Sequence, residues 1–303
     1  MKKIVILQHG GGELTNQLWN YISIYAYGKE KGVPVVNNSF FEYGSNFCTP
    51  KSHLSNLLLY RPFKNHLKRR NSFKRQLWRK FYKIYVYVVK TFKKSSIVSS
   101  VNGNNAVTYL PPTSTDFTEP DKKTLYFDGW LFRNPVGLEK YREDILKYFR
   151  PADVVINKVD KFLQPHLGKY LVGVHIRQGD YKVFKGGKYF VEQKRIQEII
   201  SKYLSFSGRT IENTFFIFTS DGSIEKDVFS ELNYTVSNMG PVEDLFLLSK
   251  MKVVLGSDSS FGDFSAWYGN IPHIVFQKEA MDWEYYKEKN IFFENKYSTM
   301  VHY

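Results

Sequence analysis

The 303-residue sequence has little cysteine and no long hydrophobic run. A single cysteine, Cys48, excludes an intramolecular disulfide and is typical of a reducing compartment. No stretch approaches the roughly 18 apolar residues of a membrane-spanning helix. The apolar run from Ile4 to Leu7 is too short for a signal peptide, and it indicates a first strand instead. These features predict a cytoplasmic protein.

Several common binding motifs are also missing. The glycines at 10–12 lack the G-x-G-x-x-G spacing of a dinucleotide site, and no Walker lysine follows them. The sequence has no Asp-x-Asp pair, and its acidic stretches at 225–227 and 282–284 lie in the wrong context for one. No Cys/His cluster is present. We therefore expect no metal and no resident cofactor.

Acidic residues are absent from positions 64–94, although the chain as a whole carries a net charge of +14. The basic residues of this stretch are Lys64, Lys68, Arg69, Arg70, Lys74, Arg75, Arg79, Lys80, Lys83, Lys90, Lys93 and Lys94. An apolar series with i, i+3/i+4 spacing runs between them, namely Phe73, Leu77, Phe81, Ile84 and Val88, and predicts an amphipathic helix. Such a helix fits an anionic membrane surface, where peripheral contact is expected. The alternative is a helix that packs on the core and leaves its charged face solvated. Nucleic-acid binding is disfavoured because no binding module accompanies the basic stretch.

Strands and helices alternate in both halves of the sequence. This pattern predicts an α/β class with two Rossmann-like layers that face each other across a cleft. Pro151 ends a helix expected over 138–149, so we place the boundary between domains 1–150 and 151–303 there. Residues 95–123 are rich in Ser, Thr, Asn and Pro and are expected to be irregular, whereas 223–231 are expected to be helical.

In the second half, polar residues suited to binding or catalysis are most concentrated in the stretch L-V-G-V-H-I-R-Q-G-D-Y at 171–181. It begins as a buried strand and ends in His175, Arg177 and Asp180. An Arg at the carboxyl end of a parallel strand suits phosphate oxygens. The alternative interpretation is a surface Arg–Asp pair beside a core histidine.

Further polar residues follow other predicted strands or open predicted helices of the second half. They are Asp221, Asp244 and the serine turn of Ser259 and Ser260, which would provide an anion site at a helix N-terminus. All would face one crevice with Arg177. Together they predict a nucleotide-diphosphate site, in which protein cations and backbone amides neutralise the leaving group.

The first half offers a second candidate loop. Gly11 and Gly12 allow the backbone to approach a ligand closely. Asn16 follows at the start of a predicted helix, where its amide could face a ligand or cap the helix.

Four blocks of the sequence resemble the bacterial α-1,2-fucosyltransferases of glycosyltransferase family 11 and, more distantly, protein O-fucosyltransferases. G-G-E-L-T-N-Q-L at 11–18 resembles the family's G-G-L-G-N-Q loop, and V-H-I-R-Q-G-D-Y at 174–181 resembles H-I-R-R-G-D-Y. F-I-F-T-S-D at 216–221 resembles F-V-F-S-D. The block at 243–267, with S-D-S-S-F-G-D-F-S-A-W, resembles D-L-Y-L-M-S followed by N-S-S-F-S-W-W-G-A-W.

This resemblance implies a GT-B fold and a metal-independent, inverting transfer of L-fucose from GDP-fucose to a glycan hydroxyl. Carried over by position, Arg177 and Ser260 with the Phe261 amide would hold the diphosphate. Asp244 would bind the guanine edge, and His175 and Asn16 would lie near the sugar. The implied setting is surface polysaccharide or O-antigen synthesis on a lipid carrier, at the inner face of the cytoplasmic membrane.

The sequence also departs from the family pattern. Gln178 stands where a second Arg is usual, Thr15 replaces a loop glycine, and G-D-F replaces S-W-W. These changes leave the α-1,2 linkage and the fucose open. An inverting transfer needs a base, for which Glu13 and Asp128 are candidates. Alternatives are a transferase for another nucleotide-sugar, a non-catalytic nucleotide- or sugar-binding protein, and a membrane-surface adaptor built on residues 64–94.

Overall fold

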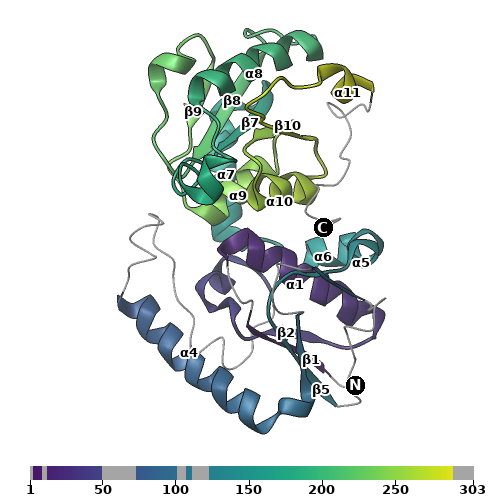
Figure 1. Cartoon of the computed structure of the whole chain (residues 1–303). Helices are drawn as coiled ribbons and strands as arrows, with labels where there is room; N and C mark the ends of the chain where they lie inside the picture. Colours follow the sequence, from purple (N-terminus) through teal and green to yellow (C-terminus); the bar gives the residue numbers. More distant parts are fainter. Residues whose placement is uncertain (1–2, 9–11, 50–72, 101–106, 111–122, 289–303) are drawn as a thin grey trace. The chain divides into compact units, whose positions relative to one another are not determined.

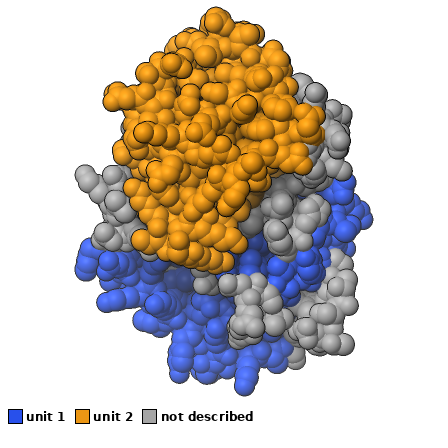
Figure 2. All heavy atoms as spheres, turned by 45° about the horizontal axis from the view of Figure 1, so that its top comes forward, with its two compact units in different colours: residues 1–154, 301–303 blue, residues 155–300 orange. Residues whose placement is uncertain are grey.

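The computed structural model describes residues 3–8, 12–49, 73–100, 107–110 and 123–288 (Figure 1). The chain divides into two compact units, Met1–Val154 and Val155–Met300 (Figure 2). The roles expected for the two domains, acceptor side and donor side, stay predictions.

Unit 1 contains a parallel sheet with the strand order β2-β1-β5-β3. Its strands are β1 (Lys3–Gln8), β2 (Val35–Asn37), β3 (Ile97–Ser99) and β5 (Thr124–Asp128). The short strands β4 (Thr108–Tyr109) and β6 (Phe132–Arg133) pair with each other. Strands β3 and β4 lie in the segment expected to be irregular. They are only three and two residues long, so they leave little periodic pattern in the sequence.

Two long helices cover opposite faces of this sheet (Figure 1). Helix α1 (Leu14–Glu30) places Tyr27 against Phe127 of β5. Helix α4 (Phe73–Phe92) packs on the neighbouring residue Tyr126 and on Leu7 of β1. Because successive residues of a strand point to opposite faces, α1 and α4 lie on the two sides of the sheet. The remaining elements of unit 1 are η1 (Phe40–Glu42), η2 (Gly44–Asn46), η3 (Lys94–Ser96), α5 (Pro135–Lys140) and α6 (Arg142–Tyr148).

Unit 2 contains a parallel sheet with the order β11-β10-β7-β8-β9. Its strands are β7 (Tyr170–Ile176), β8 (Thr214–Ser220), β9 (Tyr234–Val236), β10 (Val253–Gly256) and β11 (His273–Val275). Its helices are α7 (Asp153–Leu163), α8 (Gln193–Ser207), α9 (Pro241–Leu248), α10 (Ser260–Gly269) and α11 (Trp283–Glu288), with the short turns η4 (Gln164–His166), η5 (Phe184–Gly187) and η6 (Lys226–Phe229). The chain crosses over so that β7 lies at the centre of the sheet, which places the end of β7 between the ends of β8 and β10.

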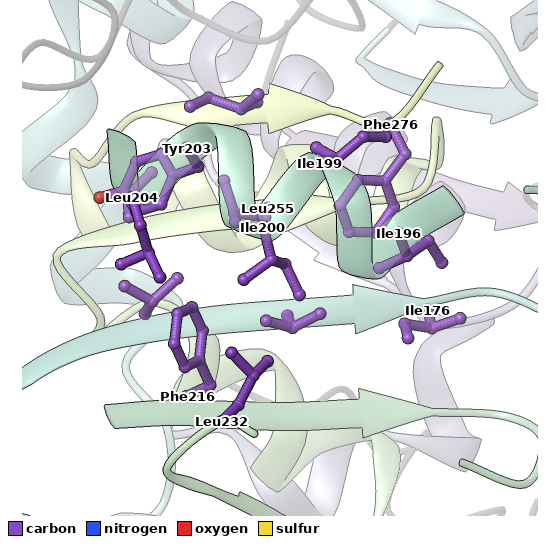
Figure 3. Packing of buried hydrophobic residues seen from close by; sticks show 14 of the residues in the cluster. Ile176, Ile196, Ile199, Ile200, Tyr203, Leu204, Phe216, Leu232, Leu255 and Phe276 are labelled. Atoms are coloured by element: carbon purple, nitrogen blue, oxygen red, sulfur yellow. The ribbon is translucent and has the colours of Figure 1, made fainter. Parts of the chain in front are cut away.

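The core of unit 2 forms where α8 lies on the sheet. Ile196, Ile200 and Tyr203 of α8 are fully buried and face the strand residues Ile176 and Phe216 (Figure 3). Their spacing of three and four residues keeps them on one side of the helix. On the other face, Gly173 has no side chain, and a Cβ there would lie 2.7 Å from Leu248 of α9. The strand therefore contacts α9 closely only because position 173 is glycine.

Two predicted helices differ from the structure. The helix expected over 138–149 is two helices, α5 and α6, separated at Tyr141. Asn134 caps α5 by accepting a hydrogen bond from the Gly137 N–H, so the first helix begins before the predicted start. The helix expected over 223–231 is the single 3₁₀ turn η6.

Candidate functional site

The predicted polar residues of unit 2 gather at the carboxyl edge of its sheet. Arg177 directly follows β7, Asp221 follows β8, and Ser257 follows β10. All these strands run parallel, so their carboxyl ends share one edge. This edge is where open α/β sheets bind ligands.

Arg177 lies at the centre of this edge and keeps 29% of its side chain exposed. Its Nε is 3.2 Å from Asp221 Oδ2, and it donates through Nε and Nη2 to Asp180 Oδ1 at 3.1 and 3.0 Å. Partial burial by itself would lower the pKa of Arg177, but Asp221 and Asp180 outweigh it and raise that pKa above its ordinary value. The guanidinium is therefore a fixed cation that still reaches solvent.

Asp221 shapes the loop that carries Arg177. Its Oδ1 accepts hydrogen bonds from the backbone N–H groups of Gln178 at 2.7 Å and Gly179 at 3.1 Å. A Cβ at position 179 would lie 2.8 Å from the Asp221 carboxylate, so a larger residue there would have to displace that carboxylate. Gln178, at the position of the family's second Arg, is 8% exposed and packs beside Gly222. The side chain at 178 therefore contributes no charge to the edge.

The loop after β10 is tied to the same motif. Ser257 Oγ accepts from the Arg177 backbone N–H at 2.9 Å, and the Tyr181 hydroxyl donates to the Asp258 carbonyl at 2.7 Å. Ser257 was not among the predicted site residues. The serine-rich turn contained the signal, but spacing alone does not tell which hydroxyl faces the protein.

Helix α10 begins directly after these contacts. Ser259 is its N-cap residue with extended backbone angles, and Ser260 and Phe261 form its first turn. The Ser259 side chain is buried, and its Oγ has no hydrogen-bond partner within the described part of the chain. The first N–H groups of a helix lack intrahelical acceptors and carry partial positive charge. An anion accepted here would find backbone donors together with an unsatisfied hydroxyl.

His175 lies beneath this turn. Its ring stacks on Phe261, with 4.7 Å between the centroids, and its Nδ1 is 3.2 Å from Thr219 Oγ1. Burial first, and then the neighbouring side chains of Arg177 and His273, lower the pKa of His175 to about 3. His175 is therefore neutral at physiological pH and supports Phe261 from below. The Nε2 atom is buried and has no partner among the described residues.

A second buried histidine contact was not anticipated. His273 Nδ1 lies 2.9 Å from Asp263 Oδ1, and both side chains are almost fully buried. Asp263 belongs to the G-D-F departure noted in the sequence, and the pair joins α10 to β11. Gly262 gives the imidazole its space, since a Cβ there would lie 2.8 Å from His273 Nε2.

Asp244 lies in the first turn of α9, after β9. Its Oδ1 accepts from the Ser237 hydroxyl at 2.5 Å, and this serine directly follows β9. Asp244 is therefore at the same edge of the sheet as Arg177, one strand farther from the centre than Asp221.

In unit 1 the glycine loop leads into α1, although Gly11 lies outside the described residues. Gly12 has a left-handed backbone with φ +77°, and a Cβ there would lie 2.4 Å from Asn16 Nδ2. The Asn16 amide thus covers the Gly12 backbone, an arrangement that requires glycine.

The two candidate bases are both held by other side chains. Glu13 accepts from the Tyr43 hydroxyl at 2.7 Å and pairs with Arg75 of α4 at 3.4 Å. Asp128 pairs with Lys90 of α4 at 2.5 Å and accepts from Gln8. Each carboxylate is therefore already paired with a cation from α4.

No protein-family model matches the sequence, and no curated protein matches it. Solved structures of similar fold include POFUT1 in complex with GDP-fucose, at 13% identity and TM-score 0.54 over 92% of this chain and 98% of that one. NodZ from Bradyrhizobium, a fucosyltransferase, gives 12% identity and TM-score 0.53 over 92% and 97%. FUT1 of Arabidopsis thaliana in complex with GDP gives 13% identity and TM-score 0.50 over 92% and 71%.

These likenesses establish the fold. The predicted GT-B-like α/β class is confirmed, because the chain shares its parallel α/β architecture with these proteins. The resemblance to fucosyltransferases is confirmed at the level of fold, whereas membership of the α-1,2 family stays a prediction.

Proposed function

We propose that this protein is a glycosyltransferase that transfers L-fucose from GDP-fucose to a hydroxyl of a glycan. The observation that supports this most directly is the position of Arg177. It is a partly exposed guanidinium at the central strand end, next to the serine turn that opens α10. The fold likeness to proteins solved with GDP-fucose or GDP supports a nucleotide-sugar as the donor.

In this proposal Arg177 and the first turn of α10 hold the diphosphate of the donor. Ser259 Oγ and the backbone amides of Ser260 and Phe261 supply hydrogen bonds to the phosphate oxygens. The Asp244 carboxylate accepts hydrogen bonds from the guanine of the donor. Asp221 acts by positioning, because its carboxylate fixes the loop of Arg177. Charge that develops on the leaving diphosphate is stabilised by these preorganised donors, so the reaction needs no metal.

The acceptor chemistry belongs to the proposal as well. We propose a glycan hydroxyl, in α-1,2 linkage, within a surface polysaccharide or O-antigen repeat carried on a lipid. Asn16, Gly11 and Gly12 of the first loop are the proposed contacts near the sugar, and His175 supports Phe261 of the phosphate turn. As the base, Glu13 would have to release Arg75 or Tyr43 first.

The decisive experiment compares donors. The full chain is incubated separately with labelled GDP-fucose, GDP-mannose and UDP-sugars, with EDTA present in parallel samples. We expect sugar release or transfer from GDP-fucose only, unchanged by EDTA. Turnover of a UDP-sugar alone would contradict the fucose assignment, and loss of activity with EDTA would contradict metal independence.

A non-catalytic nucleotide-binding protein is the second candidate, favoured by the uncharged Gln178 at the edge. Calorimetry with GDP separates the two. GDP binding without turnover on a panel of oligosaccharides would support the binding protein.

A further inference from the structure

Helix α4 has two apolar faces, and only one of them packs on the protein. Tyr82, Val86 and Val89 are buried against Leu7 and Phe41 of unit 1. Arg75 lies on the same side and is buried with Glu42 at 2.8 Å. The helix is therefore firmly attached without using the apolar series that its sequence displays most clearly.

That apolar series faces solvent. We call it the outward face of α4, and its residues are Phe73, Leu77, Phe81, Ile84 and Val88. Their exposed fractions include 78% for Phe73, 52% for Phe81 and 61% for Ile84. At about 100° per residue the five side chains share an arc of about 80°, on the side opposite Tyr82. Tyr87 and Phe92 add two further exposed rings on the same helix.

Basic residues accompany the outward face. Lys80 and Lys83 lie along one border of it, and α4 contains no acidic residue. In contrast to Arg79 and Lys90, which pair with Glu42 and Asp128, Lys80 and Lys83 have no ion pair with any described residue. The surface thus combines large apolar side chains with unbalanced positive charge.

The combination of exposed apolar side chains and positive charge indicates which kind of partner fits the outward face of α4. Within the described residues, no helix, α4 included, is long and apolar enough to cross a bilayer. A nucleic acid would use the lysines but leave the exposed rings in water. A bilayer with anionic headgroups matches both features, because its acyl boundary accepts apolar side chains and its phosphates attract lysines.

We propose that the outward face of α4 is a docking surface for an anionic lipid bilayer. The helix would lie in the plane of the surface over its length of about 30 Å. Phe81 and Ile84 would enter the boundary between headgroups and acyl chains, while Lys80 and Lys83 contact lipid phosphates. Docking of this kind is independent of the transferase activity proposed above.

The test uses the full chain and vesicles of defined composition. Flotation is measured with phosphatidylcholine vesicles that contain phosphatidylglycerol and with phosphatidylcholine vesicles alone. We expect binding to the anionic vesicles that weakens with salt, and little binding to the neutral ones. Equal binding to both, or to neither, would overturn the proposal.

Two double variants separate the apolar and the charged contribution. Phe81→Ser with Ile84→Ser should reduce binding at least tenfold, and Lys80→Gln with Lys83→Gln about thirtyfold, given the usual contribution of a basic residue near an anionic surface. Val183→Ser in unit 2 removes an even more exposed apolar side chain and should leave vesicle binding unchanged. Circular dichroism checks that each variant is folded, which is expected because the altered side chains are exposed.

A second copy of the chain is the alternative occupant of this face. Light scattering without vesicles detects it. A dimer that Phe81→Ser with Ile84→Ser converts to a monomer, or vesicle binding that survives both double variants, would overturn the lipid proposal.

Discussion

The ion pairs at the carboxyl edges of the two sheets have opposite arrangements of charge. In unit 2 the group left accessible is a cation, Arg177, and the carboxylates Asp180 and Asp221 hold it. In unit 1 the groups at the edge are carboxylates, Glu13 and Asp128, and cations hold them. One edge is thus prepared for an anion, whereas the other has its acids occupied.

The origin of the partners also differs. The partners of Arg177 come from the motif itself and from the next strand end, so the edge of unit 2 is complete within its own sheet. The cationic partners of Glu13 and Asp128 come from α4, which lies far from Glu13 in the sequence. The carboxylates at the edge of unit 1 therefore depend on one helix, α4, for their cationic partners.

The largest effect should come from the buried pair that anchors α4. Glu42→Gln removes the carboxylate 2.8 Å from Arg75, whose side chain is 3% exposed, and leaves the buried guanidinium with the longer 3.4 Å contact to Glu13. Breaking such a pair costs about 3–5 kcal/mol. We expect the free energy of unfolding in urea to fall by that amount.

An exposed pair of the same unit is the control. Asp144→Asn breaks the contact of Lys29 with Asp144 at 2.8 Å, where both side chains are well exposed. The loss should stay within about 1 kcal/mol. Equal losses for the two variants would mean that α4 is not anchored by the buried charge.

The next effect concerns the accessible cation of unit 2. Arg177→Ala should weaken GDP binding about a hundredfold or more, because each charged hydrogen bond contributes about 1.5–3 kcal/mol and Arg can make two. Arg209→Ala is the matched control at the other end of β7, where its guanidinium lies 3.8 Å from the centroid of the Tyr170 ring. Calorimetry with GDP measures both variants, and an equal loss in the two would refute a local phosphate role.

An effect that depends on pH is expected from His175. In the unfolded chain a histidine binds a proton below about pH 6.5, whereas burial first, and then Arg177 and His273, lower the pKa of His175 in the folded chain to about 3. Between these values the unfolded state holds the extra proton. Stability is therefore lost as the pH falls from 6.5 toward 3, by about 1.4 kcal/mol per pH unit.

His175→Asn removes this contribution while keeping a polar atom near Thr219. The free energies of unfolding of the two proteins, measured from pH 7 to pH 4, should converge as the pH falls. Curves that stay parallel would show that His175 does not titrate in this manner.

The sequence allowed prediction of most of unit 2, because each of its strands and helices carries a local pattern. Arg177, Asp221 and the serine turn follow buried strands, and parallel strands bring such residues to one edge. The hydrogen bonds between these residues could not be predicted from the sequence. Whether Ser257 or Ser259 binds the Arg177 backbone depends on the path of the turn, and spacing does not encode that path.

In unit 1, the helix α4 could be predicted from the sequence, but the face on which it packs could not. The amphipathic spacing of α4 was clear in the sequence, but its most regular apolar series is the exposed one. The packed face instead combines Tyr82, Val86 and Val89 with an arginine, Arg75, whose partner Glu42 lies 33 residues away. Apolar periodicity in a sequence indicates that a helix has an apolar face. It does not reveal a buried ion pair, such as the one between Arg75 and Glu42, that determines which face packs on the protein.

The smallest expected effects separate two hydroxyls of one turn. Ser257→Ala removes the acceptor of the Arg177 N–H and should lower the free energy of unfolding by about 1 kcal/mol. Ser259 Oγ has no partner within the described residues, so Ser259→Ala should leave stability unchanged and weaken GDP binding about tenfold, as the loss of one hydrogen bond to a charged group would. For both variants, urea unfolding measures the free energy of unfolding and calorimetry measures GDP binding. If Ser259→Ala lowers stability and leaves GDP binding intact, the turn opening α10 is a structural cap, and the phosphate must bind elsewhere along the edge.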